Sequence, residues 1–257
     1  MELLRSLAPG EWEIQTIAPA WRVKDVAAHL LDTQLRKLSI CRDGHRPNVA
    51  APVLPAEVAA LVNTLNREGV TVYRRLSPQV LISLLEWAAR ESADYHMSLD
   101  PFAEAVFAVT WAGEERSANW FDTARELTER WHHQQQIRLA VHRPGIMTPE
   151  LYFPVLDCFM RGLPHAYRGQ DGEPGTLARF EVSGDCGGRW FLHRDENAWR
   201  LIDGPEGQER SRTVIPQEIA WRVFTRGIDR TAARAQVTVR GEHELGLHVL
   251  EMVAIVA

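Results

Sequence analysis

The hydrophobic pattern of this 257-residue chain changes near residue 170. Before that point, apolar residues recur at the spacing of one helix face, and after it they alternate with polar residues as they do in half-buried strands. Residues 169–175, with the sequence Gly-Gln-Asp-Gly-Glu-Pro-Gly, separate the two parts and have the composition of a linker. We therefore predict a helical domain over residues 1–168 and a small α+β domain over residues 176–257.

Five segments of the first part carry helix signals. A proline stands at or near the start of three of them, where a missing backbone N–H costs nothing. The expected helices cover residues 23–43, 55–75, 77–96, 119–142 and 148–163. Between the third and the fourth, residues 107–113 are β-prone and short, so we expect an extended connector there. Four or five such helices are expected to fold as a bundle.

The second part is expected to contain a sheet with few helices. Alternating apolar residues predict three consecutive antiparallel strands, with a turn at residues 195–197 between the last two. The expected strands cover residues 178–182, 189–193, 198–202 and 237–241, the expected helix covers residues 216–225, and residues 245–256 form an apolar closing segment that is either helix or strand. This mixture predicts a compact α+β domain.

The composition argues against several classes of protein. The net charge is −5 and no basic stripe carries interleaved aromatic residues, so nucleic acid is not expected as a partner. No apolar run reaches membrane-spanning length and the first residues lack a signal-peptide core, so we expect a cytoplasmic protein that does not cross a membrane. Cys41, Cys158 and Cys186 lack paired spacing, which suits a reducing compartment and argues against a disulfide framework or a cysteine-based zinc site.

A carboxylate and an imidazole stand four residues apart in the fourth expected helix, at Glu129 and His133. Residues at this spacing lie on one helix face, one turn apart, and can bind the same metal ion. A third ligand is available at His29, on the apolar side of the first expected helix. If the two helices pack side by side, the three side chains form a site with open coordination positions, which is typical of catalytic metal centres.

The same residues also have simpler interpretations. A single histidine on an apolar helix face is more often a hydrogen-bonded core residue than a ligand. The Glu129 and His133 pair is also compatible with a surface hydrogen bond that stabilises the helix slightly. His132 points about 100° away from His133 around the helix, so spacing alone leaves it open as the ligand instead.

Two motifs resemble the mycothiol-dependent maleylpyruvate isomerase family and, more broadly, DinB-like four-helix metalloproteins. They are WRVKDVAAHLLD at residues 21–32 and TERWHHQQQIRLAVHRPG at residues 128–145. The resemblance implies that His29, Glu129 and His133 bind the metal, and it leaves His132 at a free position. It also implies a sterol-carrier-like C-terminal domain, through residues 199–202, 237–241 and 249–256.

The resemblance implies a cofactor set and an activity. The metal is a divalent ion, with zinc as the family's usual metal and nickel as an alternative, and the second cofactor is a low-molecular-weight thiol such as mycothiol. The implied reaction is cis–trans isomerisation by thiol addition and elimination, or a related thiol S-transfer to a small-molecule substrate. The alternative is a non-catalytic protein that binds a small molecule or a lipid and keeps a structural metal in the bundle. A monomer and a homodimer are both compatible with the sequence.

Three further residues are candidates for contacts with substrate or ligands. Arg36 lies two turns after His29 on its helix face and can pair with a carboxylate in bidentate fashion. Gln136 follows His133 and can hydrogen-bond a ligand or the substrate. Arg226, in the second domain, can reach an anionic thiol or substrate across the domain boundary. For each of them, an ordinary solvated surface position is the simpler interpretation.

The sequence also suggests supporting residues around the site. Asp25, one turn before His29, can orient that imidazole or can serve as an acid in the first turn of its helix. Trp111 and Trp131 can form walls of a pocket, although core packing explains most tryptophans.

Overall fold

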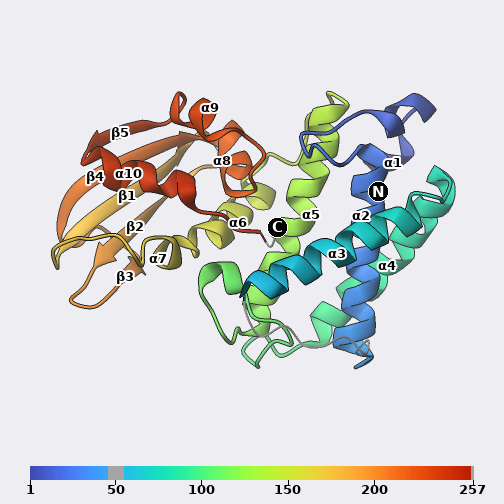
Figure 1. The fold of residues 1–257 in the computed structure, drawn as a ribbon, viewed down its shortest axis with the longest axis horizontal. Coiled ribbons are helices and arrows are strands. Elements are labelled where there is room, and N and C mark those ends of the chain that lie inside the picture. Colours follow the sequence, from blue (N-terminus) through green and yellow to red (C-terminus); the bar gives the residue numbers. More distant parts are fainter. Residues whose placement is uncertain (46–54, 256–257) are drawn as a thin grey trace.

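The structure is a computed structural model that describes residues 1–45 and 55–255. In the helix that begins at Pro55, it describes side chains from residue 60 onward. A helical region is followed by a five-stranded sheet with its own helices (Figure 1), which confirms the expected fold class. In the helical region, short 3-10 or π-helical segments are labelled η. Its elements are α1 (Glu2–Arg5), η1 (Pro9–Glu13), α2 (Val23–Lys37), η2 (Leu38–Arg42), α3 (Pro55–Tyr73), α4 (Pro78–Ser98), η3 (Thr110–Ala112) and α5 (Asn119–Ala140).

The rest of the chain alternates strands with short helices. The elements are α6 (Pro149–Met160), α7 (Leu163–Ala166), β1 (Thr176–Ser183), β2 (Gly188–Arg194), β3 (Trp199–Ile202), β4 (Gln208–Pro216), α8 (Gln217–Phe224), α9 (Arg230–Arg234), β5 (Thr238–Gly241), α10 (His243–Leu247) and η4 (His248–Glu251). Among the described residues, no helix combines the length and the apolar character that a membrane span requires.

Helix α2 begins at a capped end and buries one apolar stripe. The Asp25 carboxylate accepts a hydrogen bond from the backbone N–H of Arg22 at 3.0 Å, which satisfies a donor that the first turn leaves free. Val26 and Leu31 are fully buried in a core cluster that also contains Leu81 of α4. The expected helix over residues 23–43 is therefore present, but its last turn, η2, is a π-helix.

A buried ion pair joins α2 to α5. The Lys37 ammonium lies 2.5 Å from the Asp122 carboxylate and 3.4 Å from that of Glu126, and the side chains of Lys37 and Asp122 are each only 5% exposed. Arg125 binds both acids at 2.7 Å from the other side. Two charges of each sign therefore compensate one another in a place where an unpaired charge would be strongly destabilising.

The sheet has the strand order β3-β2-β1-β4-β5. The three antiparallel strands expected from the sequence are β1, β2 and β3, and β5 matches the fourth. The sequence did not predict β4, which lies between β1 and the edge strand β5 and runs parallel to β1. The buried face of β4 carries Ser211, Thr213 and Ile215, so it lacks the apolar alternation that reveals a strand.

Helix α6 contacts both parts of the molecule. It packs against α5, and its Tyr152 and Phe159 are fully buried in the same cluster as Phe180 of β1 and Phe224 of α8. Figure 1 shows α6 and α7 lying against the sheet. The expectation that this helix belongs to the bundle alone is therefore incomplete, and the domain boundary between residues 168 and 176 stays a prediction.

Two connecting segments complete the comparison with the sequence. The connector expected over residues 107–113 is irregular and ends in the 3-10 turn η3. The closing segment expected over residues 245–256 is helical in α10 and η4 and then extended, while residue 256 and the last residue of the expected second domain lie outside the described residues.

The ion pair between α2 and α5 makes a prediction about stability. Replacing Lys37 by methionine leaves two buried carboxylates with Arg125 as the one cation that pairs with them among the described residues, so we expect the free energy of unfolding in urea to fall by about 3 kcal/mol. The same change at exposed Arg42 should have a much smaller effect, because solvent screens its pairs with Asp43 and Glu91. Equal effects of the two substitutions would contradict this role of Lys37.

The same pair also predicts a dependence on pH. Burial alone would raise the pKa of Asp122, but Arg125 and Lys37 outweigh it and hold that pKa below its usual range. The pair therefore contributes its full stability above about pH 4, the unfolded carboxyl value, and loses it as the pH falls through the folded value. The difference in unfolding free energy between the parent and K37M should shrink below that pH.

Candidate metal centre

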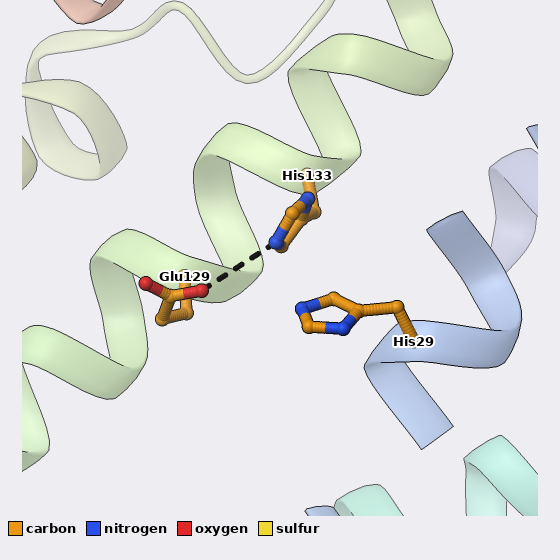
Figure 2. A group of neighbouring side chains, drawn as sticks. All are labelled: His29, Glu129 and His133. Atoms are coloured by element: carbon orange, nitrogen blue, oxygen red, sulfur yellow. Dashed lines mark ion pairs between the residues drawn. The ribbon is translucent and has the colours of Figure 1, made fainter. Parts of the chain in front are cut away.

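His29, Glu129 and His133 come together from two helices. His29 projects from α2, and Glu129 and His133 project from successive turns of α5, with all three side chains facing one point (Figure 2). One potential ligand atom from each residue lies within 4.8 Å of the other two. Bonds from zinc to histidine nitrogen and carboxylate oxygen are about 2.0–2.2 Å, so a small side-chain adjustment lets a single ion reach all three atoms.

Hydrogen bonds orient His133 within this group. Its Nδ1 lies 2.9 Å from Oε1 of Gln136, and its Nε2 lies 3.4 Å from a carboxylate oxygen of Glu129. The Gln136 oxygen can only accept, so Nδ1 carries a proton and the lone pair of a neutral ring belongs to Nε2. That nitrogen faces Glu129 and the centre of the cluster, which is the tautomer that ligation requires.

His29 packs against an aromatic ring. It is 3% exposed, and its buried Nδ1 has no hydrogen-bond partner among the described residues. The Trp21 ring lies against it with centroids 4.5 Å apart, and the same indole lies 5.7 Å from the His133 ring. Burial lowers the pKa of His29 well below its usual value, so the imidazole is neutral and able to bind a metal.

Glu129 is ionised despite its surroundings. Burial would raise the pKa of this carboxyl group, but the adjacent His133 ring and the nearby Arg125 guanidinium hold it well below its usual range. The site therefore offers two nitrogen donors and one anionic oxygen. This donor set suits zinc, and it also suits nickel, iron or manganese.

His132 stands beside the cluster and is not part of it. Its Nδ1 lies 2.9 Å from the carbonyl oxygen of Thr128 and its ring stacks on His133 at 3.9 Å. Burial lowers the pKa of His132 to about 4. The three residues whose ligand atoms lie close together include His133 and not His132.

The cluster opens onto a large cavity between the helical region and the sheet region. The cavity has a volume of about 1040 Å³. Its walls come from residues 17–21, α2, α3, residues 106–111, α5, residues 225–227 and Ile255. Because the helical region supplies His29, Glu129 and His133 while the sheet region contributes wall residues, the cavity as a whole depends on both regions.

Arg36 lines this cavity in a fixed position. Its Nε donates to Asp32 at 2.7 Å and its Nη2 donates to Asn66 of α3 at 2.7 Å. Burial raises the pKa of Asp32, and the neighbouring Arg36 opposes that rise. Gly69 on α3 leaves the room that Asp32 occupies, because a Cβ at this position would collide with the Asp32 carboxyl group.

Arg226 lines the cavity from the sheet region, just after α8. Its φ angle is 55°, in the left-handed region that favours glycine. An arginine in this conformation costs about 1 kcal/mol or more. The side chain is exposed and makes no ion pair with another described residue, so its charge is available to a ligand.

The supporting residues have three different roles: one lines the cavity, one packs in the core and one caps a helix. Trp111 lines the cavity. Trp131 belongs to the core, where it stacks on Tyr152 at 4.3 Å and donates to the carbonyl oxygen of Ile146. Asp25 binds the backbone of Arg22 and the side chain of Arg74, so it caps α2 and does not orient His29. Trp21 was not singled out from the sequence, although it forms part of the first motif.

Together these features can bind a divalent ion on the wall of a chamber with basic side chains nearby. The family model described as "Mycothiol maleylpyruvate isomerase N-terminal domain" matches residues 1–138, more than half of the chain. This protein belongs to the mycothiol maleylpyruvate isomerase N-terminal domain family. The match includes all three residues of the cluster, and the family resemblance stated from the two motifs is confirmed.

A solved structure of the isomerase shares the fold. A crystal structure of a histidine-to-alanine mutant of the mycothiol-dependent maleylpyruvate isomerase superposes with a TM-score of 0.52 at 13% identity, covering 94% of this chain and 87% of that one. A second crystal structure of that isomerase gives a TM-score of 0.49 at 15% identity, with the same coverage. A search of curated proteins gave no match. At this level of identity the likeness to the solved structures establishes the fold alone.

The close approach of α2 and α3 makes a prediction. In G69A the added methyl group displaces the Asp32 carboxylate and frees Arg36, at an overpacking cost of about 1–3 kcal/mol. Alanine has a higher helix propensity than glycine, which stabilises the helix by about 1 kcal/mol. We therefore expect the free energy of unfolding to fall by about 1 kcal/mol in total. Gly10 has open space around it, so G10A should change stability by less than about 0.5 kcal/mol. A stabilised G69A would contradict the packing described here.

Proposed function

We propose that this protein is a metal-dependent enzyme that activates a low-molecular-weight thiol for attack on an electrophilic small molecule. The reaction is either a cis–trans isomerisation or a thiol S-transfer, and mycothiol is the thiol that the family suggests. The observation that carries the proposal is the group formed by His29, Glu129 and His133 on the wall of a 1040 Å³ cavity. Two neutral imidazoles and one carboxylate leave a divalent ion with positive charge and free positions.

A divalent ion at this position would lower the pKa of a thiol from about 8.5 and so favour the thiolate at neutral pH. The protein's own residues support this chemistry in separate ways. Gln136 keeps the His133 lone pair directed at the cluster, and Trp21 excludes water from one side of the His29 ring. The cavity walls provide space for the thiol and the second substrate together.

The proposed isomerisation conserves atoms and electrons. The thiolate sulfur forms a bond to one carbon of the cis double bond, and the π electrons move to the conjugated carbonyl oxygen. Rotation about the resulting single bond follows, and the electrons then return as the C–S bond breaks and the thiolate leaves. In a transfer reaction the C–S bond remains, and the carbon next to the carbonyl group takes up the proton that the thiol lost.

Arg36 and Arg226 are proposed to bind the anionic groups of the substrates. Both line the cavity, one from α2 and the other from the sheet region. A guanidinium pairs with a carboxylate through two parallel hydrogen bonds, which fixes its orientation. The two arginines would therefore position a carboxylate relative to the thiol, and neither requires a change in protonation.

The alternative function is non-catalytic binding of a lipid or another small molecule in the sheet region, with a structural metal in the bundle. A structural metal site usually has four protein ligands, whereas no fourth His, Cys, Asp or Glu joins the cluster within residues 1–45 and 55–255. Large side chains such as Tyr167, Phe180 and Phe224 are fully buried in the core of the sheet region. Both observations favour the enzyme. A location in the cytoplasm and a monomeric or homodimeric state remain predictions.

The first test is the metal content of protein purified without a histidine tag, measured by elemental analysis. We expect about one zinc or nickel ion per chain in the parent, because three protein donors suffice for a catalytic site. H29A and E129Q should lose most of this metal, since each removes one of only three donors.

H132N is the matched control for these variants. It changes a histidine on the same cavity wall, next to His133, without removing a ligand atom from the cluster. We expect it to keep the metal. Retention of metal by H29A, or loss of metal from H132N, would show that the ligands are assigned wrongly. A parent without metal, even after zinc is added, would exclude the proposed enzyme.

Gln136 provides a second test, because it touches the metal site only through His133. In Q136L the ring nitrogen loses its acceptor, so we expect the metal affinity to fall about 10-fold to 100-fold. Q136E keeps an acceptor oxygen and should retain the affinity. Q134L removes an amide from the same helix outside the cavity lining and should have no effect on metal affinity. Equal metal affinities in Q136L and Q134L would show that Gln136 does not support the metal site.

A further inference from the structure

The cavity extends along α2, away from the metal cluster. Ile40, in the π-helix η2 that continues α2, lines it, as do His29, Thr33 and Arg36, which follow one another at intervals of three or four residues. This spacing keeps the three α2 residues on one helix face. At a rise of about 1.5 Å per residue, Arg36 lies about 10 Å along the axis from His29, and Ile40 lies further along the chain in η2. The cavity is therefore elongated, with the cluster and Ile40 at different levels.

The far end of this cavity carries three large apolar side chains. Ile40 lines the cavity together with Val106 and Phe107 of the loop between α4 and α5, and the Phe107 ring centroid lies 5.7 Å from the ammonium of Lys37, three residues before Ile40. Val106 and Phe107 are 43% and 41% exposed, although both line the cavity. These large side chains present apolar surface that packing within the chain does not cover.

The charges at this end already have partners. The ammonium of Lys37 is bound by Asp122 and Glu126, and Arg125 is bound by the same two carboxylates. An ionic ligand group placed here would compete with existing ion pairs for its contacts. An apolar group needs no such contact, and it gains from covering Val106 and Phe107.

We propose that the electrophilic substrate carries an apolar chain or ring system, which lies against Ile40, Val106 and Phe107 while its reactive end reaches the His29, Glu129 and His133 cluster. The inference rests on the proposed function and adds the substrate class to it. A small, wholly polar acid would leave this end of the cavity unused. Phe107 is thus a residue that determines specificity at a distance from the reacting atoms.

Binding of unreactive analogues tests this proposal without turnover. Saturated straight-chain carboxylates from butanoate to decanoate are titrated by calorimetry into the metal-loaded full chain and into the chelator-treated chain. Each buried methylene should raise the affinity about fourfold in both forms. In F107S the increase should stop for the longer acids, whereas F107L should restore it.

F102S is the matched control. Phe102 belongs to the same loop and is 83% exposed, but it does not line the cavity, so the chain-length dependence should match that of the parent. An affinity that does not depend on chain length, or the same loss in F107S and F102S, would overturn the proposal. If affinity depends on chain length but the protein binds no metal, the apolar binding surface at Ile40, Val106 and Phe107 is supported and the proposed enzyme is rejected. Failure of this inference and failure of the proposed function are therefore distinguishable.

Discussion

The ion pair between Lys37 and Asp122 fixes the distance between α2 and α5, and the remaining geometry follows from that distance. The two charges are almost fully buried, so neither helix can move away without leaving a charge uncompensated. His29 lies two turns before Lys37 on one helix, and Glu129 lies two turns after Asp122 on the other. The same interaction that joins the helices therefore brings ligand atoms from both within 4.8 Å.

Helix α5 also connects the cluster to the rest of the molecule. Three consecutive residues point in different directions around it: Trp131 packs into the core shared with the sheet, His132 stacks beside the cluster, and His133 belongs to it. The Trp131 ring stacks on Tyr152 of α6, whose hydroxyl in turn binds the backbone of α8. A displacement of α6 or α8 would therefore be transmitted to the helix that carries Glu129 and His133.

The sequence predicted the parts that depend on local spacing. The interval between Glu129 and His133, the position of His29 on an apolar stripe, and the first three strands follow from periods of 3.6 and 2. Other features depend on contacts distant in sequence, such as the packing of Trp21 near His133 and the position of Phe107 on the cavity wall. Strand β4 escaped prediction because its buried face carries hydroxyl groups in place of apolar side chains, and one of them, on Thr213, donates to the carbonyl oxygen of Gly246. The sequence of one strand does not show which residues elsewhere in the chain will bind its hydroxyl groups.

The two regions contribute different kinds of residue to one chamber. All three members of the cluster lie in the helical region, whereas residues 225–227 and Ile255 of the sheet region contribute only to the walls. Substitutions in those segments can reshape the chamber without altering the geometry around His29. Changes confined to these wall side chains can therefore alter which molecules the chamber admits, while the three residues of the cluster are inherited unchanged from the helical region.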